Sequence, residues 1–294
     1  ATLDLEKKLK NSIVQNQAEI TLIDKNSYHL FTPLLYEVAS AYGVTKDPFS
    51  LKLKKTISVP YQEIFEGKCV KFIQAEILKV DLAARAVVTG GGEVLYFNYL
   101  VLALGGQTDD FGVIGAKEYA CQFKNIEDAL LVNQKIAEIM EKAAENKKQS
   151  PVEILICGGG FTGVELSAEI ACFVRKIAEQ YRIKNRAGRA LIKLFEAGPK
   201  ILPGISDKER AIIKKRLTGL GVAIMENSAV GEIGSDFVKL KNGQTFSGDL
   251  VIWTAGIKAN EILRNIDGLP LTEAGKVMVN DSMLVKDSQT VFAV

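Results

Sequence analysis

The sequence predicts an α/β fold with two Rossmann-like units, one inserted into the other. Three observations predict it: a glycine-rich turn between a strand and a helix, a series of elements that occurs twice along the chain, and a final strand, Thr290–Val294, that should return to the first sheet. With 294 residues and 47% hydrophobic side chains, the chain is long enough to bury a large core.

The first copy of the repeated series starts with a helix, Ala1–Val14, whose apolar side chains recur on one face. A strand that ends on an acid, Ala18–Asp24, follows. After it come alternating segments around 73–80 and 86–89, the turn Gly90–Glu93 and an apolar strand ending on glycine, Tyr99–Gly105. We expect this last strand to be buried.

The second copy has the same order of elements. It consists of the strand Val152–Cys157, the helix Gly163–Ala178, the strand Ala190–Glu196, segments around 230–233 and 237–240 next to the turn Asn242-Gly243, and the buried strand Asp249–Gly256. A helix that Asn125 can cap lies between the copies. We expect one unit at 1–116, the inserted unit at 117–269, and a return to the first unit at 270–294.

The repeat also exposes a difference between the two copies. A glycine-rich turn precedes the helix of the second copy, whereas the chain begins within the corresponding helix of the first. Any matching turn would lie upstream of Ala1, and the final apolar run stops without a turn or cap. We therefore expect the chain to be a fragment.

The turn Gly158-Gly-Gly160-Phe-Thr-Gly163 has the G-x-G-x-x-G spacing of dinucleotide-binding proteins. In that motif the first glycine permits a tight turn, the second lets a pyrophosphate approach the backbone, and the third lets the helix pack closely on the strand. The helix N-terminus supplies N–H donors and positive potential. The alternative is a glycine-rich turn that binds no ligand. The position of this turn between a strand and a helix favours dinucleotide binding over that alternative.

The motif also requires an acid at the end of the next strand, which accepts hydrogen bonds from the ribose. Glu196 occupies this place, 33 residues after Gly163, with the basic stretch 175–189 as an insertion. A carboxylate there repels a 2′-phosphate, so NADH is favoured over NADPH, although nearby Lys200 tempers the preference. By the same logic Asp24 should bind the ribose of a first nucleotide.

Other residues are less informative or exclude functions. We place Glu165 in the first turn of the helix, where the dipole favours a carboxylate, with a role near the nicotinamide as the second interpretation. His29 is the single histidine, which excludes a multi-histidine metal site, and we interpret it as structural. The four cysteines have no metal-ligand spacing, and no metal is expected. A net charge of +2 does not favour nucleic acid, and no apolar run is long enough to span a membrane.

Four segments resemble the type II NADH dehydrogenases, flavoproteins that oxidise NADH and reduce membrane quinone. They are Tyr28–Ala39, Leu100–Gly105, Cys157–Glu165 and Val251–Gly256, and the similarity covers essentially the whole chain. The first segment is the most discriminating, because the dinucleotide turn is common to all pyridine-nucleotide flavoenzymes.

This resemblance implies that FAD occupies the first unit and NADH the second. The implied FAD residues are Asp24, Thr32, Pro33, Ala103 and Gly105. The implied NADH residues are Gly158, Gly160, Gly163, Glu196, Ala255 and Gly256, with Glu165 near the nicotinamide. Hydride would pass from NADH to FAD and electrons to a quinone, without proton pumping.

The resemblance further implies a peripheral respiratory-chain enzyme on the cytoplasmic face of the inner membrane, attached through a C-terminal region absent from this soluble segment. It also implies a homodimer. A sulfide:quinone oxidoreductase is the alternative enzyme, and it needs a cysteine pair beside the flavin. A non-catalytic NAD-binding module is the alternative from another class.

Overall fold

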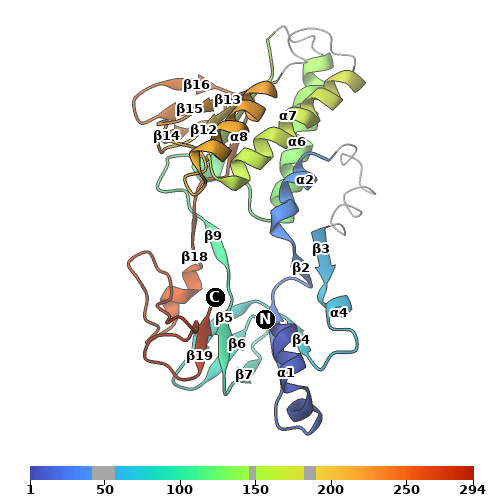
Figure 1. Ribbon diagram of the computed structural model, residues 1–294, viewed down its shortest axis with the longest axis vertical. Coiled ribbons are helices and arrows are strands. Elements are labelled where there is room, and N and C mark those ends of the chain that lie inside the picture. The colour runs from blue at the N-terminus through green and yellow to red at the C-terminus, as the bar shows by residue number, and fades with distance from the viewer. Residues whose placement is uncertain (42–56, 146–149, 182–189) are drawn as a thin grey trace. The chain divides into compact units, whose positions relative to one another are not determined.

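The computed structural model describes residues 1–41, 57–145, 150–181 and 190–294. They form two compact units, each drawn in Figure 1. The first consists of Ala1–Leu30, Ser58–Gln107 and Lys258–Val294, and the second of Phe31–Ile57 and Thr108–Ile257. Because the second unit interrupts the first along the chain, the predicted α/β fold with an inserted unit is confirmed. The nucleotide assigned to each segment, and the bounds at 116 and 269, stay predictions.

The second unit is built on a five-stranded parallel sheet in the order β10-β17-β11-β12-β13. The strands are β10 (Cys121–Gln122), β11 (Glu153–Cys157), β12 (Leu191–Phe195), β13 (Val222–Met225) and β17 (Leu250–Trp253). Their near-continuous apolar sequences fit a sheet covered on both faces, and every residue of β17 is buried. The chain order reverses beside β11, so the carboxyl end of this strand is a switch point at which α/β proteins bind ligands.

Helices α6 (Ile126–Glu145), α7 (Phe161–Gln180) and α8 (Asp207–Gly219) connect the strands of this sheet. Asn125 caps α6 as predicted, since its Oδ1 accepts a hydrogen bond from the Asp128 amide. Helix α2 (Leu35–Ala39) follows the 3-10 turn η1 (Thr32–Leu34) and packs on both α6 and α7, as Figure 1 shows. The short helix α5 (Ala116–Tyr119) completes the helices described in this unit.

The repeat seen in the sequence is present in both units as a three-stranded antiparallel sheet. In the first unit it consists of β5 (Ile77–Asp81), β6 (Ala86–Thr89) and β7 (Val94–Tyr96), and in the second of β14 (Val230–Ile233), β15 (Phe237–Leu240) and β16 (Thr245–Ser247). Gly92 and Gly243 have positive φ values of 80° and 90° in the predicted turns. Each sheet precedes a strand that pairs in parallel, β8 (Leu100–Leu102) or β17.

The remaining elements of the first unit are three helical segments and strands that pair two by two. They are α1 (Thr2–Val14), β1 (Thr21–Asp24) with β4 (Lys71–Gln74), β2 (Tyr28–Leu30) with β3 (Ser58–Pro60), α4 (Tyr61–Ile64), η3 (Glu261–Asn265), and β8 (Leu100–Leu102) with β19 (Val291–Ala293). The pairing of β19 with β8 confirms the expected return of the final strand. Strands β9 (Gly106–Thr108) and β18 (Ile257–Ala259) pair where the chain passes between units.

Two local predictions were wrong. Strand β8 is not buried throughout, because within the described residues it pairs with β19 alone and Val101 remains 51% exposed. Glu165 does not lie in the first helical turn. Helix α7 begins at Phe161, where the Gly160 carbonyl accepts the first helical hydrogen bond from Val164, so Glu165 falls in the second turn.

Asn133 of α6 holds the end of α2 from inside the second unit. This fully buried side chain donates from Nδ2 to the carbonyl oxygens of Val38, Ala39 and Ala41 at 2.9–3.2 Å. Because α2 ends at Ala39, these carbonyls lack the usual helical partners, although the Val38 carbonyl also accepts a long bond from the Ala41 amide at 3.4 Å. The amide therefore acts as a C-terminal cap supplied by a distant element.

Replacing Asn133 with leucine is expected to lower the free energy of unfolding by about 2–3 kcal/mol, because buried carbonyls would lose their donor. Urea unfolding followed by circular dichroism measures the change. Gln134 is the matched control on the same helix, since its side chain is exposed and its leucine variant should stay within about 0.5 kcal/mol of the parent. Equal effects of the two variants would contradict the capping role.

Candidate functional site

The glycine turn lies at the carboxyl edge of the parallel sheet, between β11 and α7. The Gly158 amide donates to the Phe195 carbonyl at 2.8 Å, and Thr254 donates from Oγ1 to the Gly158 carbonyl at 3.1 Å. The turn is thus bonded to the ends of both neighbouring strands, β12 and β17. The structure places the predicted residues Gly158, Glu196 and Ala255 together at one edge.

Each glycine of the motif is required for a different physical reason. At Gly158 φ is +120°, and a Cβ would lie 2.7 Å from the Ala255 amide nitrogen. At Gly163 a Cβ would overlap the Gly158 carbonyl oxygen and approach Thr254 Oγ1 to 2.8 Å. At Gly160 a Cβ would meet nothing within 4 Å, and the residue is exposed. Packing therefore explains the first and third glycines, whereas the open space at Gly160 fits an approaching pyrophosphate.

Glu196 follows β12 directly and faces the glycine turn. Its Oε2 accepts from the Gly159 amide at 2.9 Å, and its Oε1 accepts from the Gly198 amide at 2.7 Å. Each carboxylate oxygen keeps a lone pair after accepting one hydrogen bond. The half-buried carboxylate is therefore held in a fixed position and can still accept from two hydroxyl groups.

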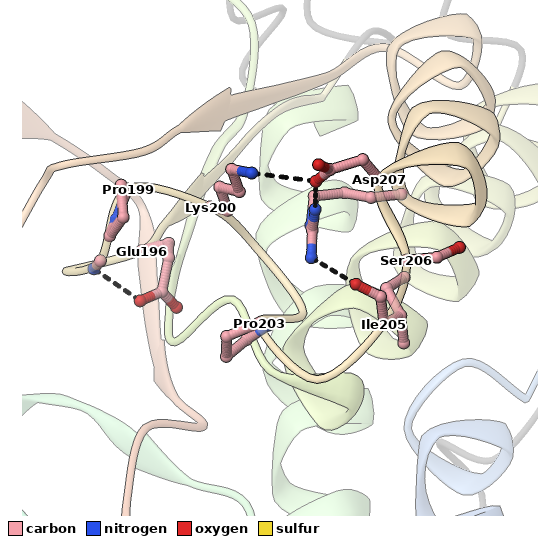
Figure 2. Close-up of a pocket in the computed structure, with 9 residues that line it drawn as sticks. Glu196, Pro199, Lys200, Pro203, Ile205, Ser206 and Asp207 are labelled. Atoms are coloured by element: carbon pink, nitrogen blue, oxygen red, sulfur yellow. Dashed lines mark hydrogen bonds and ion pairs between the residues drawn. The ribbon is translucent and has the colours of Figure 1, made fainter.

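A pocket of about 400 Å³ opens beside this carboxylate. Figure 2 shows the loop after β12 and the start of α8 around it. The lining residues are Glu196, Gly198, Pro199, Lys200, Pro203, Ile205, Ser206, Asp207 and Arg210. This size and the mixed polar and apolar lining suit one end of a dinucleotide.

Arg210 of α8 fixes the loop that forms the pocket wall. The guanidinium group of this buried residue donates to the carbonyl oxygens of Ile201, Leu202 and Ile205 at 2.7–3.0 Å and also contacts Asp207. The sequence analysis did not identify Arg210, since a lone arginine in a basic helix has no distinguishing pattern. The S-x-x-E capping box that starts α8 at Ser206 was visible in the sequence and was overlooked.

Glu165 lies on α7 near Tyr36 of α2. Its side chain is exposed, yet partial desolvation by the surrounding protein raises the pKa of the carboxyl group. The pKa of the Tyr36 phenol is also raised, first by desolvation and then by the charges of Glu165, Glu37 and Glu169. The carboxyl group thus holds its proton to a higher pH than an ordinary glutamate.

The other predicted residues of the second unit lie at the surface or at the strand end. Thr32 and Pro33 are exposed on η1. Gly256 has a φ of +78°, and a Cβ there would overlap the Phe111 ring, so glycine is required by both backbone and packing.

In the first unit, Asp24 ends β1 as predicted. Its Oδ1 accepts from the Asn26 amide at 2.8 Å, and its Oδ2 accepts from the Tyr61 hydroxyl at 2.9 Å. Ala103 and Gly105 are exposed after β8, and Gly105 has a φ of +62°. His29 is exposed on β2, opposite Val59 of β3. Tyr61, which no sequence pattern indicated, therefore positions the Asp24 carboxylate.

The Tyr61 phenol is expected to make the free energy of unfolding depend on pH. Desolvation, followed by the hydrogen bond and charge of Asp24, raises its pKa well above the ordinary value of 10.0. The unfolded chain loses this proton first, so stability is full below pH 10 and falls as the pH rises further. The expected slope is about 1.4 kcal/mol per pH unit.

Tyr61→Phe should remove this contribution, so its stability should decline less steeply between pH 10 and 11 than that of the parent. Urea unfolding at pH 8, 10 and 11 measures both slopes. Identical slopes for the two proteins would contradict the role of the Tyr61 hydroxyl.

The cysteines and acids do not form a redox or metal centre within the described residues. All four cysteines are free thiols. Burial raises the pKa of the Cys157 thiol to about 12, and burial is also the main cause of the raised pKa of Cys121. Reactive thiols need a low pKa, so neither residue suits thiolate chemistry. No cluster suited to a metal ion occurs in the part of the chain that the structure describes.

Comparison with known proteins finds oxidoreductases that are similar to this chain in sequence or in fold. A type II NADH:quinone oxidoreductase of Haemophilus influenzae is 27% identical over 95% of this chain and 67% of its own length. The NDH2 of Plasmodium falciparum, solved in complex with NADH, has a TM-score of 0.78 at 23% identity over 95% of this chain. A sulfide:quinone oxidoreductase of Aquifex aeolicus has a TM-score of 0.76 at 19% identity over 99% of this chain. At these identities, the two structural similarities show a shared fold.

The curated relative has the name of the family that the sequence resembles, so the resemblance is confirmed. The chain spans 59% of the length of the Plasmodium protein and 65% of the Aquifex protein. The sequence profile described as pyridine nucleotide-disulphide oxidoreductase matches residues 6–294, nearly the whole chain. This chain belongs to the pyridine nucleotide-disulphide oxidoreductase family.

Proposed function

We propose that this chain carries the NADH-binding unit, and residues of the FAD-binding unit, of an NADH:quinone oxidoreductase. The observation that carries the proposal is the glycine turn at the switch point of the parallel sheet, with open space at Gly160 and the Glu196 carboxylate beside it. The name of the curated relatives supports a quinone as the electron acceptor.

The segment predicted to form the NADH-binding unit, 117–269, would bind NADH. Gly158, Gly160 and Gly163 would accommodate the pyrophosphate, and Glu196 would accept from the ribose hydroxyls of the adenosine. Ala255 and Gly256, at the end of β17, would line the path of the dinucleotide. Glu165 would lie near the nicotinamide end, where partial desolvation raises the pKa of its carboxyl group and so favours proton uptake relative to an ordinary glutamate.

The segments predicted to form the FAD-binding unit, 1–116 and 270–294, would contribute to an FAD site. Asp24 keeps lone pairs for a ribose although two donors already hold it. Ala103 and Gly105 are exposed residues after β8, and the resemblance also assigns the exposed residues Thr32 and Pro33 to FAD. When bound, NADH supplies a hydride and FAD accepts it, while the protein supplies alignment.

We further propose peripheral contact with the cytoplasmic face of a membrane, as part of a respiratory chain, and a homodimer. In the described residues no helix combines the length and the apolar sequence needed to cross a bilayer. The sulfide alternative receives no support from Cys121 and Cys157, because both are buried with raised thiol pKa values.

An anaerobic titration of the complete gene product tests this proposal. Flavin absorbance is followed while NADH, NADPH or sulfide is added, and a soluble quinone is added last. Bleaching by NADH far more readily than by NADPH, with colour restored by quinone, is the expected result. Bleaching by sulfide alone would favour the alternative enzyme, and a protein that binds NADH without a flavin would be a non-catalytic module.

A further inference from the structure

The loop between β12 and α8 is fixed on several sides, so its side chains start from defined positions. The Ile201 amide donates to Glu226 at 2.9 Å, and the Leu202 amide donates to the Gly159 carbonyl at 2.9 Å. Leu202 has a φ of +50°, a strained conformation that the Arg210 hydrogen bond to its carbonyl helps to maintain. The pocket beside Glu196 is therefore preorganised.

Two cationic residues line this pocket, and both contact Asp207. Arg210 is buried, and hydrogen bonds from its guanidinium group to three backbone carbonyls hold it in place. Lys200 is different. Its side chain is 54% exposed, and its ammonium group pairs with Asp207 Oδ1 at 2.9 Å. Figure 2 shows this pair. Among the lining residues, Lys200 is the cation that can turn toward a ligand.

We propose that Asp207 sets the preference for NADH over NADPH by holding Lys200 in an ion pair. The inference rests on the proposed NADH site. The two nucleotides differ by a 2′-phosphate, a group of nearly two negative charges that proteins recognise with arginine or lysine. Glu196 repels this phosphate at the ribose, and Asp207 withholds the cation that would compensate for the repulsion.

The position of Asp207 makes this restraint effective. Arg210, anchored in the protein, contacts the same Oδ1 that Lys200 contacts, so the carboxylate is fixed before Lys200 pairs with it. Formation of the ion pair therefore costs little more than the side-chain entropy that Lys200 loses. An exposed ion pair is nevertheless weak, so the effect on specificity should be moderate and not absolute.

Isothermal titration with 2′,5′-ADP and 5′-AMP tests the inference, because these probes contain the adenosine end with and without the extra 2′-phosphate. Asp207→Asn should tighten 2′,5′-ADP binding about fivefold, or about 1 kcal/mol. Binding of 5′-AMP should stay within about twofold. In Asp207→Asn combined with Lys200→Met, the gain should disappear.

Two further variants make the test specific. Glu232→Gln removes one negative charge of the same unit outside the pocket, where Glu232 pairs with Lys239 at 3.5 Å, and should not change the ratio of the two affinities. Lys200→Met in the parent should also leave the ratio unchanged, because Asp207 already withholds the ammonium group. This variant keeps the inference testable even if Asp207→Asn is poorly folded.

Three results would overturn the inference: an unchanged ratio in folded Asp207→Asn, a gain that persists without Lys200, or a large loss of 2′,5′-ADP affinity in Lys200→Met alone. Failure of the proposed function would look different, since neither probe, nor NADH, would bind any of the proteins. Thermal unfolding of each variant establishes that it is folded.

Discussion

Replacing Gly163 with alanine is expected to abolish NADH binding and to lower the free energy of unfolding by about 2–3 kcal/mol. The added Cβ would overlap the Gly158 carbonyl oxygen, and it would lie 2.8 Å from Thr254 Oγ1. Both neighbours belong to hydrogen-bonded backbone or strand ends and cannot move independently. The helix must therefore separate from the strand, which displaces the N–H groups that would bind the pyrophosphate.

Gly160→Ala is the matched control in the same turn. Its φ of −73° is open to any residue, and a Cβ would meet no protein atom within 4 Å. The variant should unfold at the same urea concentration as the parent, yet bind NADH at least about tenfold more weakly because the methyl group occupies the space for the pyrophosphate. Urea unfolding and isothermal titration separate the two effects. Normal NADH affinity in Gly160→Ala would contradict the assignment of the turn.

Arg210→Met is expected to lower the free energy of unfolding by about 3 kcal/mol and to weaken NADH binding. The substitution leaves the carbonyl oxygens of Ile201, Leu202 and Ile205 without their donor in a region where Ile201 and Leu202 are buried. The strained Leu202 backbone loses a restraint, so the wall of the pocket should relax. Binding should weaken although Arg210 itself need not touch the nucleotide.

Arg216→Met is a suitable control, because Arg216 is exposed in the last turn of the same helix. This variant should stay within about 0.5 kcal/mol of the parent. Arg210→Lys should behave nearly like Arg210→Met, since a single ammonium group cannot reproduce the geometry of the guanidinium fork. Full stability in Arg210→Lys would mean that charge, and not the set of hydrogen bonds, holds the loop.

The sequence predicted the fold where local patterns and tertiary packing agree. The strand before Gly158 and the acid after β12 were found because apolar runs, turn residues and the spacing of glycines have direct structural causes. The roles of Gly158 and Gly163 follow from the same steric argument in the sequence and in the structure. Asn125 likewise caps α6 through contacts only three residues apart.

The sequence by itself determined the two-unit α/β fold, the glycine turn between β11 and α7, and the place of Glu196. Only the tertiary structure revealed Tyr61 on Asp24, Asn133 on the end of α2, and Arg210 on the pocket loop. The sequence analysis placed Glu165 in the first turn of α7 instead of the second. The start of this helix depends on backbone hydrogen bonds that a run of glycines does not determine. Periodicity reports which face of an element is buried, whereas the partner of a polar side chain depends on how distant segments pack.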